Sequence, residues 1–305
     1  MTRGKPSNVA ASVRQRLLKI IRETGDDSNL VWTRYATERF LYRLSVSEYA
    51  GDFILKGAML FRAWTGQSYR PTVDMDLLGH GEDSRERLAR MFQNVCEIDV
   101  EPDGLMFDVN TMEVIPIREE QEYKGKRVKL TAFLGKARIP VQVDVGFGDV
   151  VTPEARKISY PVLLDYPAPN IRAYPRETVV AEKFQTMVIL GIANSRMKDF
   201  YDLYVLSREF AFDGDTLVRA IKATFKRRKT VIPIEPPQAL TDEFGRDEMK
   251  SIQWNAFIRK SGLEERIPEL LELLSHLRDF LLPPMKAAAG DGSFQLSWAR
   301  GGPWS

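Results

Sequence analysis

The most constraining feature of this chain is a short run in which two aspartates alternate with apolar residues. In the segment 73–77, VDMDL, residues two apart would lie on the same side of a β-strand. The carboxylates of Asp74 and Asp76 would then leave one face, while Val73, Met75 and Leu77 enter the core. Two neighbouring anions repel each other, and a hard divalent cation such as Mg2+ or Mn2+ removes that repulsion. The pair predicts a metal site on a strand, with an ordinary solvated strand face as the alternative.

The residues just before this strand indicate a phosphate-binding loop. Lys56 and Gly57 precede a helix expected over 58–64, and a glycine lets the backbone approach a ligand closely. The first turn of that helix, beginning at Ala58, would offer backbone N–H groups to phosphate. The order of loop, helix and acidic strand is typical of metal-dependent transfer from a nucleoside triphosphate.

The whole segment from Phe53 to Leu78 resembles the AbiEii/AbiGii group of nucleotidyltransferase-like toxins, which belong to the DNA polymerase β-like superfamily. In that group a Lys-Gly-Gly-like helix start is followed by Arg-x-Ser/Thr-x-Asp-x-Asp. The matching residues here are Lys56, Gly57, Arg70, Thr72, Asp74 and Asp76. Ala58 stands where the group usually has Gly or Ser, so a side-chain hydroxyl contact to phosphate is lost at that position.

A third carboxylate is expected beside the first two. The segment 140–149, PVQVDVGFGD, alternates valines with polar residues and predicts a strand that could place Asp144 near Asp74 and Asp76. The resemblance implies that Asp144 is a third metal ligand. The residues alone equally allow Asp144 to end its strand as a turn acceptor.

A lysine on an apolar helix face marks a second candidate region. The segment 176–191 predicts a helix that ends at Gly191, and its broad apolar arc includes Lys183 between Leu190 and Met187, with Gln185 on the opposite side. An ammonium group in that position is costly unless it meets an anion or its stem extends to solvent. A triphosphate would be such an anion, and a lysine that extends to solvent at a domain rim is the alternative.

The next predicted helix, 195–210, carries two aspartates. On its helical wheel Asp199 lies among the buried residues, whereas Asp202 falls on the polar side as the i,i+4 partner of Lys198. The two helices resemble the toxin group's later motifs, Ala-Glu-Lys and Lys-Asp-x-x-Asp. By this resemblance Lys183 and Asp199 are active-site residues.

The net charge is only +2, but basic residues cluster in two stretches. The first is Lys222, Lys226, Arg227, Arg228 and Lys229, and the second is Lys124, Lys126, Arg127 and Lys129. Either could hold an RNA backbone through its phosphates. A solvated helix face is the ordinary alternative.

Periodicity predicts a mixed α+β chain with a polymerase β-like core and a helical C-terminal lobe. Helices are expected over 12–24, 33–49 and 84–96, and strands over 109–117, 127–134 and 139–145. The Pro-rich run 160–175 is interpreted as a connector. Residues 1–160 would form the nucleotidyltransferase core with its leading helices, and 161–305 a mainly helical lobe that contributes Lys183 and Asp199 to the cleft.

Composition narrows the class of protein. No stretch approaches the roughly 20 apolar residues of a membrane helix, and the N-terminus lacks the apolar core of a signal peptide. One cysteine excludes an internal disulfide framework, and two histidines make a His-dependent mechanism an unfavoured hypothesis. These features predict a cytoplasmic enzyme.

Together the residues and the resemblance predict an NTP- and Mg2+-dependent nucleotidyltransferase. The resemblance implies the toxin of an AbiE-like toxin–antitoxin or phage-defence pair, acting on an RNA acceptor such as tRNA and opposed by an antitoxin protein. Three alternatives stay open: a metal-dependent nuclease, a phosphotransferase, and a non-catalytic member that binds a partner.

Overall fold

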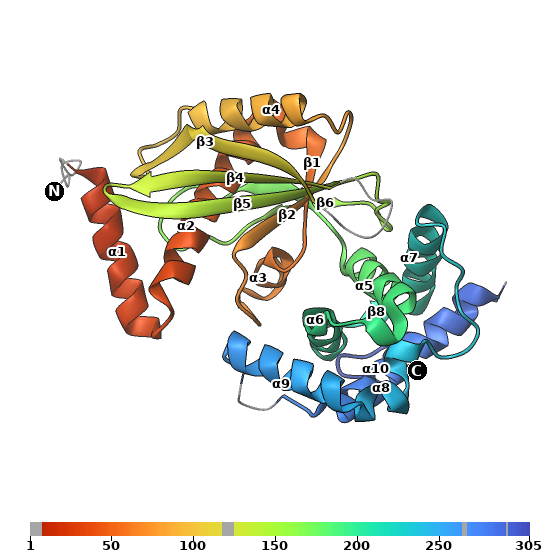
Figure 1. Cartoon of the computed structure of the whole chain (residues 1–305). Coiled ribbons are helices and arrows are strands. Elements are labelled where there is room, and N and C mark those ends of the chain that lie inside the picture. Colours follow the sequence, from red (N-terminus) through yellow and green to blue (C-terminus); the bar gives the residue numbers. More distant parts are fainter. Residues whose placement is uncertain (1–7, 118–124, 264–266, 291) are drawn as a thin grey trace. The chain divides into compact units, whose positions relative to one another are not determined.

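A computed structural model of the chain describes residues 8–117, 125–263, 267–290 and 292–305 (Figure 1). The chain folds into two compact units. The first comprises the residues up to Gly148 together with Arg156–Ala173, and the second comprises Asp149–Ala155 and Tyr174–Ser305. The chain therefore crosses between the units after residues 148, 155 and 173.

The first unit is built on a mixed seven-stranded sheet. Its strands are β1 (Phe53–Lys56), β2 (Asp74–Gly79), β3 (Leu105–Ile117), β4 (Gly125–Leu134), β5 (Ala137–Phe147), β6 (Arg156–Ser159) and β7 (Asn170–Ala173). Their order is β3-β4-β5-β2-β1-β7-β6, with β2 parallel to β5, β1 parallel to β7, and the other neighbours antiparallel. Its helices are α1 (Val9–Thr24), α2 (Ser28–Val46), α3 (Met59–Thr65) and α4 (Arg85–Glu97), with the 3-10 helix η1 (Glu48–Asp52). The predicted mixed α+β class is confirmed.

One face of this sheet is covered by α2 and α4. The ring of Phe40 in α2 contacts Phe92 in α4 and Phe107 in β3, with centroids 5.4 and 5.6 Å apart. The covered face also buries the alternating apolar residues of β5 and β2, such as Val143 and Met75. The residues between them, including the aspartates of β2 and β5, lie on the opposite, partly exposed face. The alternation of apolar and polar residues along β2 and β5 thus determines which face of the sheet carries the aspartates.

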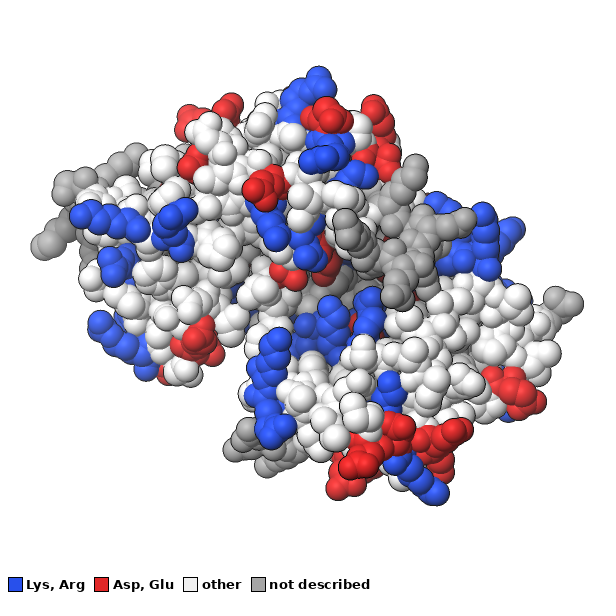
Figure 2. Space-filling view, viewed as in Figure 1, with Lys and Arg blue, Asp and Glu red and all other residues white. Residues whose placement is uncertain are grey.

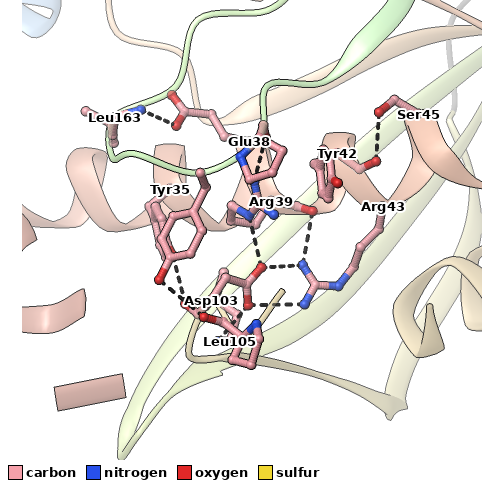
Figure 3. Close-up of polar contacts among 12 residues, drawn as sticks. Tyr35, Glu38, Arg39, Tyr42, Arg43, Ser45, Asp103, Leu105 and Leu163 are labelled. Carbon is pink, nitrogen blue, oxygen red and sulfur yellow. Dashed lines mark hydrogen bonds and ion pairs between the residues drawn. The ribbon is translucent and has the colours of Figure 1, made fainter. Parts of the chain in front are cut away.

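A buried ion cluster joins α2 to the loop before β3 (Figure 3). Asp103 accepts hydrogen bonds from Arg39 Nε at 2.9 Å and from Arg43 Nη1 and Nη2 at 2.6 and 3.1 Å. Burial opposes ionisation of Asp103, but the bonds from Arg43 and Arg39 outweigh it and lower the pKa of that carboxyl. Nearby, Glu38 Oε2 accepts the backbone N–H of Leu163 at 2.9 Å. A pattern of apolar residues could not reveal this cluster, because the partners are distant in the sequence.

The second unit is mainly helical, as predicted. Its elements are α5 (Arg176–Leu190), η2 (Gly191–Ala193), α6 (Met197–Glu209), β8 (Phe212–Asp213), α7 (Gly214–Arg227), η3 (Gln238–Leu240), α8 (Asp242–Arg246), α9 (Glu248–Ser261), α10 (Leu270–Ala289) and β9 (Ser297–Trp298). Helix α5 packs against α6 and α7, and α10 packs against α6 and α7. Within the part of the chain that the structure describes, no helix has both the length and the apolar character needed to span a bilayer.

Two details of the fold differ from the sequence-based predictions. The Pro-rich run is more than a connector, because it contains β7, which pairs with β1 and keeps residues 161–173 in the first unit. For that reason the first unit extends to Ala173 and does not end at residue 160, where the sequence predicted the boundary. Val73 is 48% exposed and does not enter the core, because β2 begins only at Asp74.

Candidate active site

Four charged residues lie directly opposite one another across neighbouring strands of the first unit. Lys56 of β1 is opposite Asp76 of β2, Asp76 is opposite Asp144 of β5, and Asp144 is opposite Arg127 of β4. Directly opposite residues project from the same face of a sheet. The structure thus places Asp144 beside Asp76, as the strand pattern predicts. Asp144 lies inside β5, so the alternative in which it ends its strand is wrong.

Asp144 is held by a guanidinium group. Arg127 donates from Nε to Oδ1 at 2.8 Å and from Nη2 to Oδ2 at 2.7 Å. This hydrogen-bonded contact with Asp144 raises the pKa of Arg127 against the opposing effect of burial, and the charges of Asp144, Asp74 and Asp76 add to the rise. Arg127 therefore belongs to the carboxylate group rather than to a separate basic stretch. The pairing of Arg127 with Asp144 follows from the register of the hairpin that β4 and β5 form.

Gly57 has a reason to be glycine that the sequence could not show. Its φ is +74°, and a Cβ built on it would lie 2.0 Å from Asp76 Oδ2. The close approach is thus to the side chain of Asp76. In the first turn after Gly57, the N–H groups of Leu60 and Phe61 bond to the carbonyls of Gly57 and Ala58. The expected phosphate contact is thereby restricted to the amides of Ala58 and Met59.

The remaining residues of the predicted nucleotide-binding set lie around the start of β2 and α3. Thr72 donates from Oγ1 to the carbonyl of Asp74 at 3.4 Å, and Arg70 donates from Nη1 to the carbonyl of Pro71 at 3.4 Å. Ala58 caps α3 without a side-chain hydrogen bond. The loss of a hydroxyl at this position, expected from the sequence, therefore also leaves the helix start without a side-chain cap.

The chemistry of the donor set at β2 fits a hard divalent cation. Asp74 and Asp76 are both half-buried, lie two residues apart on one strand face, and supply only oxygen atoms. Within the described residues, no group of three or more His, Cys, Asp and Glu side chains could hold a metal ion. The role of Asp144 as a third ligand stays a prediction, since both of its oxygens bond to Arg127.

In the second unit, Lys183 lies between two buried carboxylates. Its Nζ is 2.5 Å from Asp199 Oδ1 and 2.8 Å from Asp202 Oδ2, and Arg196 Nε is 2.6 Å from Asp199 Oδ2. The Lys183 side chain is 15% exposed and those of the two aspartates 1% and 2%. Burial alone would raise the pKa of Asp199, but the charges of Lys183 and Arg196 hold it well below its usual range. The anion that Lys183 requires is thus present within its own unit.

Two predicted helix faces are wrong in this region. The helical wheel puts Asp202 on the polar side beside Lys198, but it is buried, because residues three apart on α6 are neighbours and both aspartates face Lys183. The wheel of α5 puts Gln185 opposite the core, but it is buried where α7 packs on α5. Its amide bonds to Thr230 Oγ1 at 2.8 Å and accepts from Arg228 Nη1 at 2.9 Å. A helical wheel assumes one covered side, and α5 has two.

The predicted RNA-binding stretch contains both half-buried and exposed side chains. Arg228 pairs with Asp149 at 3.0 Å and with Glu182 at 3.4 Å, and Lys222 Nζ donates to the carbonyl of Gly290 at 3.0 Å. The exposed members are Lys226, Arg227 and Lys229. Figure 2 shows Lys and Arg side chains gathered over α7, at the right of the view.

The second basic stretch is also divided. Lys124 lies outside the described residues. Lys126 Nζ is 3.8 Å from Asp83 Oδ2, and Arg127 pairs with Asp144. Of the described members, Lys129 is exposed. This distribution favours the stretch at the end of α7 as the candidate RNA contact.

The comparison with protein families agrees with the sequence motifs. Residues 39–276 match the model of a family described as "Nucleotidyl transferase AbiEii toxin, Type IV TA system". A comparison with curated proteins gives no significant match. Among solved structures, JHP933 from Helicobacter pylori has a TM-score of 0.45 and 13% identity over 93% of this chain and 92% of that one. A second H. pylori protein, described as a candidate nucleotidyltransferase, has a TM-score of 0.44 and 12% identity over 93% and 94% of the two chains.

Proposed function

Because the chain belongs to the AbiEii family of nucleotidyltransferase toxins from type IV toxin–antitoxin systems, we propose that it transfers a nucleotide from an NTP to an RNA acceptor. The observation that supports this most directly is the position of Asp74 and Asp76. Both leave the exposed face of β2, and the Gly57 loop is packed against the second of them. This closeness in one unit supports the proposal that the Gly57 loop binds the nucleotide beside the two oxygen donors.

Asp74 and Asp76 are the residues that would hold a divalent cation, Mg2+ or Mn2+. Such an ion polarises the α-phosphate and lowers the pKa of the attacking hydroxyl. Lys56, opposite Asp76, supplies positive charge on the same face, and the Gly57 turn keeps the backbone close to the carboxylates. Thr72 and Arg70 precede the strand, where their side chains can reach phosphate oxygens.

Lys183 and Asp199 enter the proposal through the motifs they share with the family. We assign Asp199 the part of orienting Lys183, because the two groups are 2.5 Å apart. A role for Asp199 as general base is disfavoured, since its pKa is held low by Lys183 and Arg196 and its carboxylate is buried. For Lys183 to bind the triphosphate, a phosphate group would have to replace Asp199 or Asp202 as its anionic partner.

The acceptor that we propose is RNA, and tRNA in particular, acted on in the cytoplasm. The exposed basic residues at the end of α7 support this choice, because a long anionic substrate needs contacts beyond those of the NTP. We further propose that an antitoxin opposes the activity and that the pair takes part in phage defence.

The test is incubation of the protein with each α-labelled NTP, Mg2+ and total RNA. We expect label to enter one class of RNA, and we expect Asp74→Ala and Asp76→Ala each to reduce the rate by about 10²-fold or more, with little loss of fold. Val73→Ala is the matched control, because this neighbour is exposed and outside the proposed machinery. Near-normal transfer by Asp76→Ala would contradict the two-carboxylate site.

The same experiment separates the alternatives. A nuclease would shorten RNA without NTP, and a phosphotransferase would add a phosphate rather than a nucleotide, which mass spectrometry distinguishes. A non-catalytic member would keep its biological effect in the Asp74→Ala, Asp76→Ala double variant.

A further inference from the structure

A loop of exposed aliphatic residues directly follows the basic end of α7. Val231 is 85% exposed and Ile234 is 75% exposed, so both side chains project into water. Single exposed aliphatic residues are ordinary on a protein surface, whereas several gathered together mark a site of interaction. The loop also stands next to a cluster of cations, which limits the kind of partner that it fits.

Hydrogen bonds to α5 and η2 fix this loop at both ends. At its start Thr230 Oγ1 accepts from Gln185 Nε2 at 2.8 Å, and at its end Gln238 Oε1 accepts from the backbone N–H of Ile192 at 3.4 Å. The loop therefore runs beside the end of α5, where Ile189 and Ile192 are 46% and 44% exposed. We call Val231, Ile234, Ile189 and Ile192 the apolar patch.

The backbone of the loop suits burial away from water. Prolines stand at positions 233, 236 and 237, and each lacks the N–H donor that would need a hydrogen-bond partner in an apolar environment. Their fixed φ also limits the conformations of the free loop, which lowers the entropy lost when a partner orders it. The loop is thus less costly to desolvate than a loop without prolines.

The residues just before the loop supply positive charge. Lys226, Arg227 and Lys229 all have exposed side chains. Lys229 has a φ of +49°, the left-handed conformation that glycine usually adopts just after a helix. Glu235 follows Ile234 and is an exposed acid within the loop. A partner for this surface must therefore accept aliphatic side chains and carry negative charge.

A lipid surface fits this combination better than three other partners. An RNA backbone would use the cations but would give Val231 and Ile234 no apolar contact. A second copy of the chain, joined patch to patch, would bring two basic clusters together and be repelled. A protein partner would need a cavity shaped to two projecting side chains, whereas the fluid boundary between lipid headgroups and acyl chains takes up a projecting apolar group without such a cavity. Anionic headgroups would in addition attract the cations.

We propose that the apolar patch and the cations beside it bind an anionic lipid surface. Val231 and Ile234 enter the boundary between headgroups and acyl chains, and the cations at the end of α7 contact the headgroups. Glu235 stays at the level of the headgroups and limits the depth of insertion, because burying its charge is costly. The contact is peripheral and reversible, and it does not depend on whether the chain transfers nucleotides.

The test is flotation of the full chain with vesicles made either of phosphatidylcholine alone or of phosphatidylcholine mixed with phosphatidylglycerol. We expect binding to the mixed vesicles only, with an affinity that falls as the salt concentration rises. The double variant Val231→Ser, Ile234→Ser should bind them about tenfold more weakly, because both side chains lose their apolar burial. Lys226→Ala, Arg227→Ala should cause a similar loss and reduce the salt dependence. Glu235→Gln should tighten binding, because it removes a charge that opposes insertion and is repelled by the headgroups.

Met249→Ser, Ile252→Ser is the matched control. These two residues of α9 are 59% and 51% exposed in the same unit, but Asp247 and Glu248 precede them in place of cations. Their substitution removes a comparable amount of exposed apolar surface and should leave vesicle binding unchanged. Thermal unfolding of each variant confirms that the protein measured is folded.

RNA binding separates this proposal from the proposed function. Both use Lys226 and Arg227, but Val231→Ser, Ile234→Ser should keep the native affinity for RNA. A loss of RNA affinity in that variant would assign the loop to RNA and overturn the lipid surface. Native-like vesicle binding by the folded variant, or no vesicle binding by the native chain, would overturn it as well. If vesicles bind as expected but RNA gains no nucleotide, the proposed function fails while the lipid surface stands.

Discussion

Gly57 and Asp76 constrain each other at the scale of single residues. The glycine has a positive φ, and its Cα–H side faces the carboxylate so closely that no Cβ fits. The sequence alone could indicate a glycine loop, but it could not say that the loop packs against an aspartate of the following strand. The side-chain position of Asp76 therefore depends on the absence of a side chain at position 57.

Gly57→Ala is expected to reduce both stability and activity, whereas a matched glycine elsewhere should lose only stability. The positive φ costs about 1–2 kcal/mol with alanine, and the methyl group would also displace the Asp76 carboxylate. Gly66→Ala is the control, because Gly66 has a φ of +76° and a Cβ built on it would meet nothing within 4 Å. Urea unfolding should report a larger loss in Gly57→Ala than in Gly66→Ala, because its methyl group would also meet Asp76 Cβ at 2.8 Å. The nucleotide-transfer rate should fall only in Gly57→Ala, and equal rates in the two variants would contradict the role of the contact.

Lys183→Met should destabilise the second unit. From the sequence, an ammonium on an apolar arc looks uncompensated, but in the structure it neutralises two buried aspartates. Removing one partner of such a cluster typically costs about 3–5 kcal/mol, because the remaining charges stay buried. Urea unfolding should show this loss, and Asp202→Asn in the same chain should restore part of it. A Lys183→Met protein as stable as the native one would show that the aspartates find another cation.

At the scale of the element, most boundaries follow from local signals, while the burial of polar residues does not. The helix expected over 84–96 starts at a Ser84 cap, and Gly191 ends α5 as predicted from residue type. Strand β7 escapes prediction, because its four residues lie in a Pro-rich run and become a strand only by pairing with β1. The burial of Asp202 depends on Lys183, which lies on a different helix. Local patterns predict an element, whereas its contacts depend on elements that are distant in the sequence.

The first turn of α6 should make stability sensitive to acid. Asp199 has a lowered pKa in the folded protein, because Lys183 and Arg196 outweigh the effect of burial. Its contribution is therefore fully present above the unfolded pKa of about 4 and is lost as the pH falls from there toward the folded pKa. Urea unfolding between about pH 3 and 7 should show a steeper acid loss for the native chain than for Asp199→Asn. Equal slopes for the two proteins would contradict this assignment.

At the scale of the whole molecule, the small net charge of +2 conceals a local excess of basic residues at the end of α7. The sequence predicts this cluster, but it cannot distinguish Arg228, whose partners Asp149, Glu182 and Gln185 hold it, from its exposed neighbours. Which charges are available to a partner is decided by tertiary contacts.

If this cluster binds RNA, changing Lys226 and Arg227 to Ala should weaken RNA binding and flatten its salt dependence by up to about two phosphate contacts. Arg259 and Lys260 provide the control, because they are exposed in the same unit and their substitution removes the same charge. The measurement is the slope of log affinity against log salt concentration. Identical slopes for the two double variants would leave the α7 cluster as a solvated face.

The three chain crossings between the units have a consequence for proteolysis. A protease that cut only at the second crossing, after Ala155, would produce two fragments that each hold part of the other's unit. The N-terminal fragment would carry Asp149 and Thr152, which bond to Arg228 and Thr178, and the C-terminal fragment would carry β7, which pairs with β1. The nicked protein should therefore elute from a sizing column as one species and separate only in denaturant. A chain shortened to begin at Tyr174 would lack the Asp149 partner of Arg228 from the start.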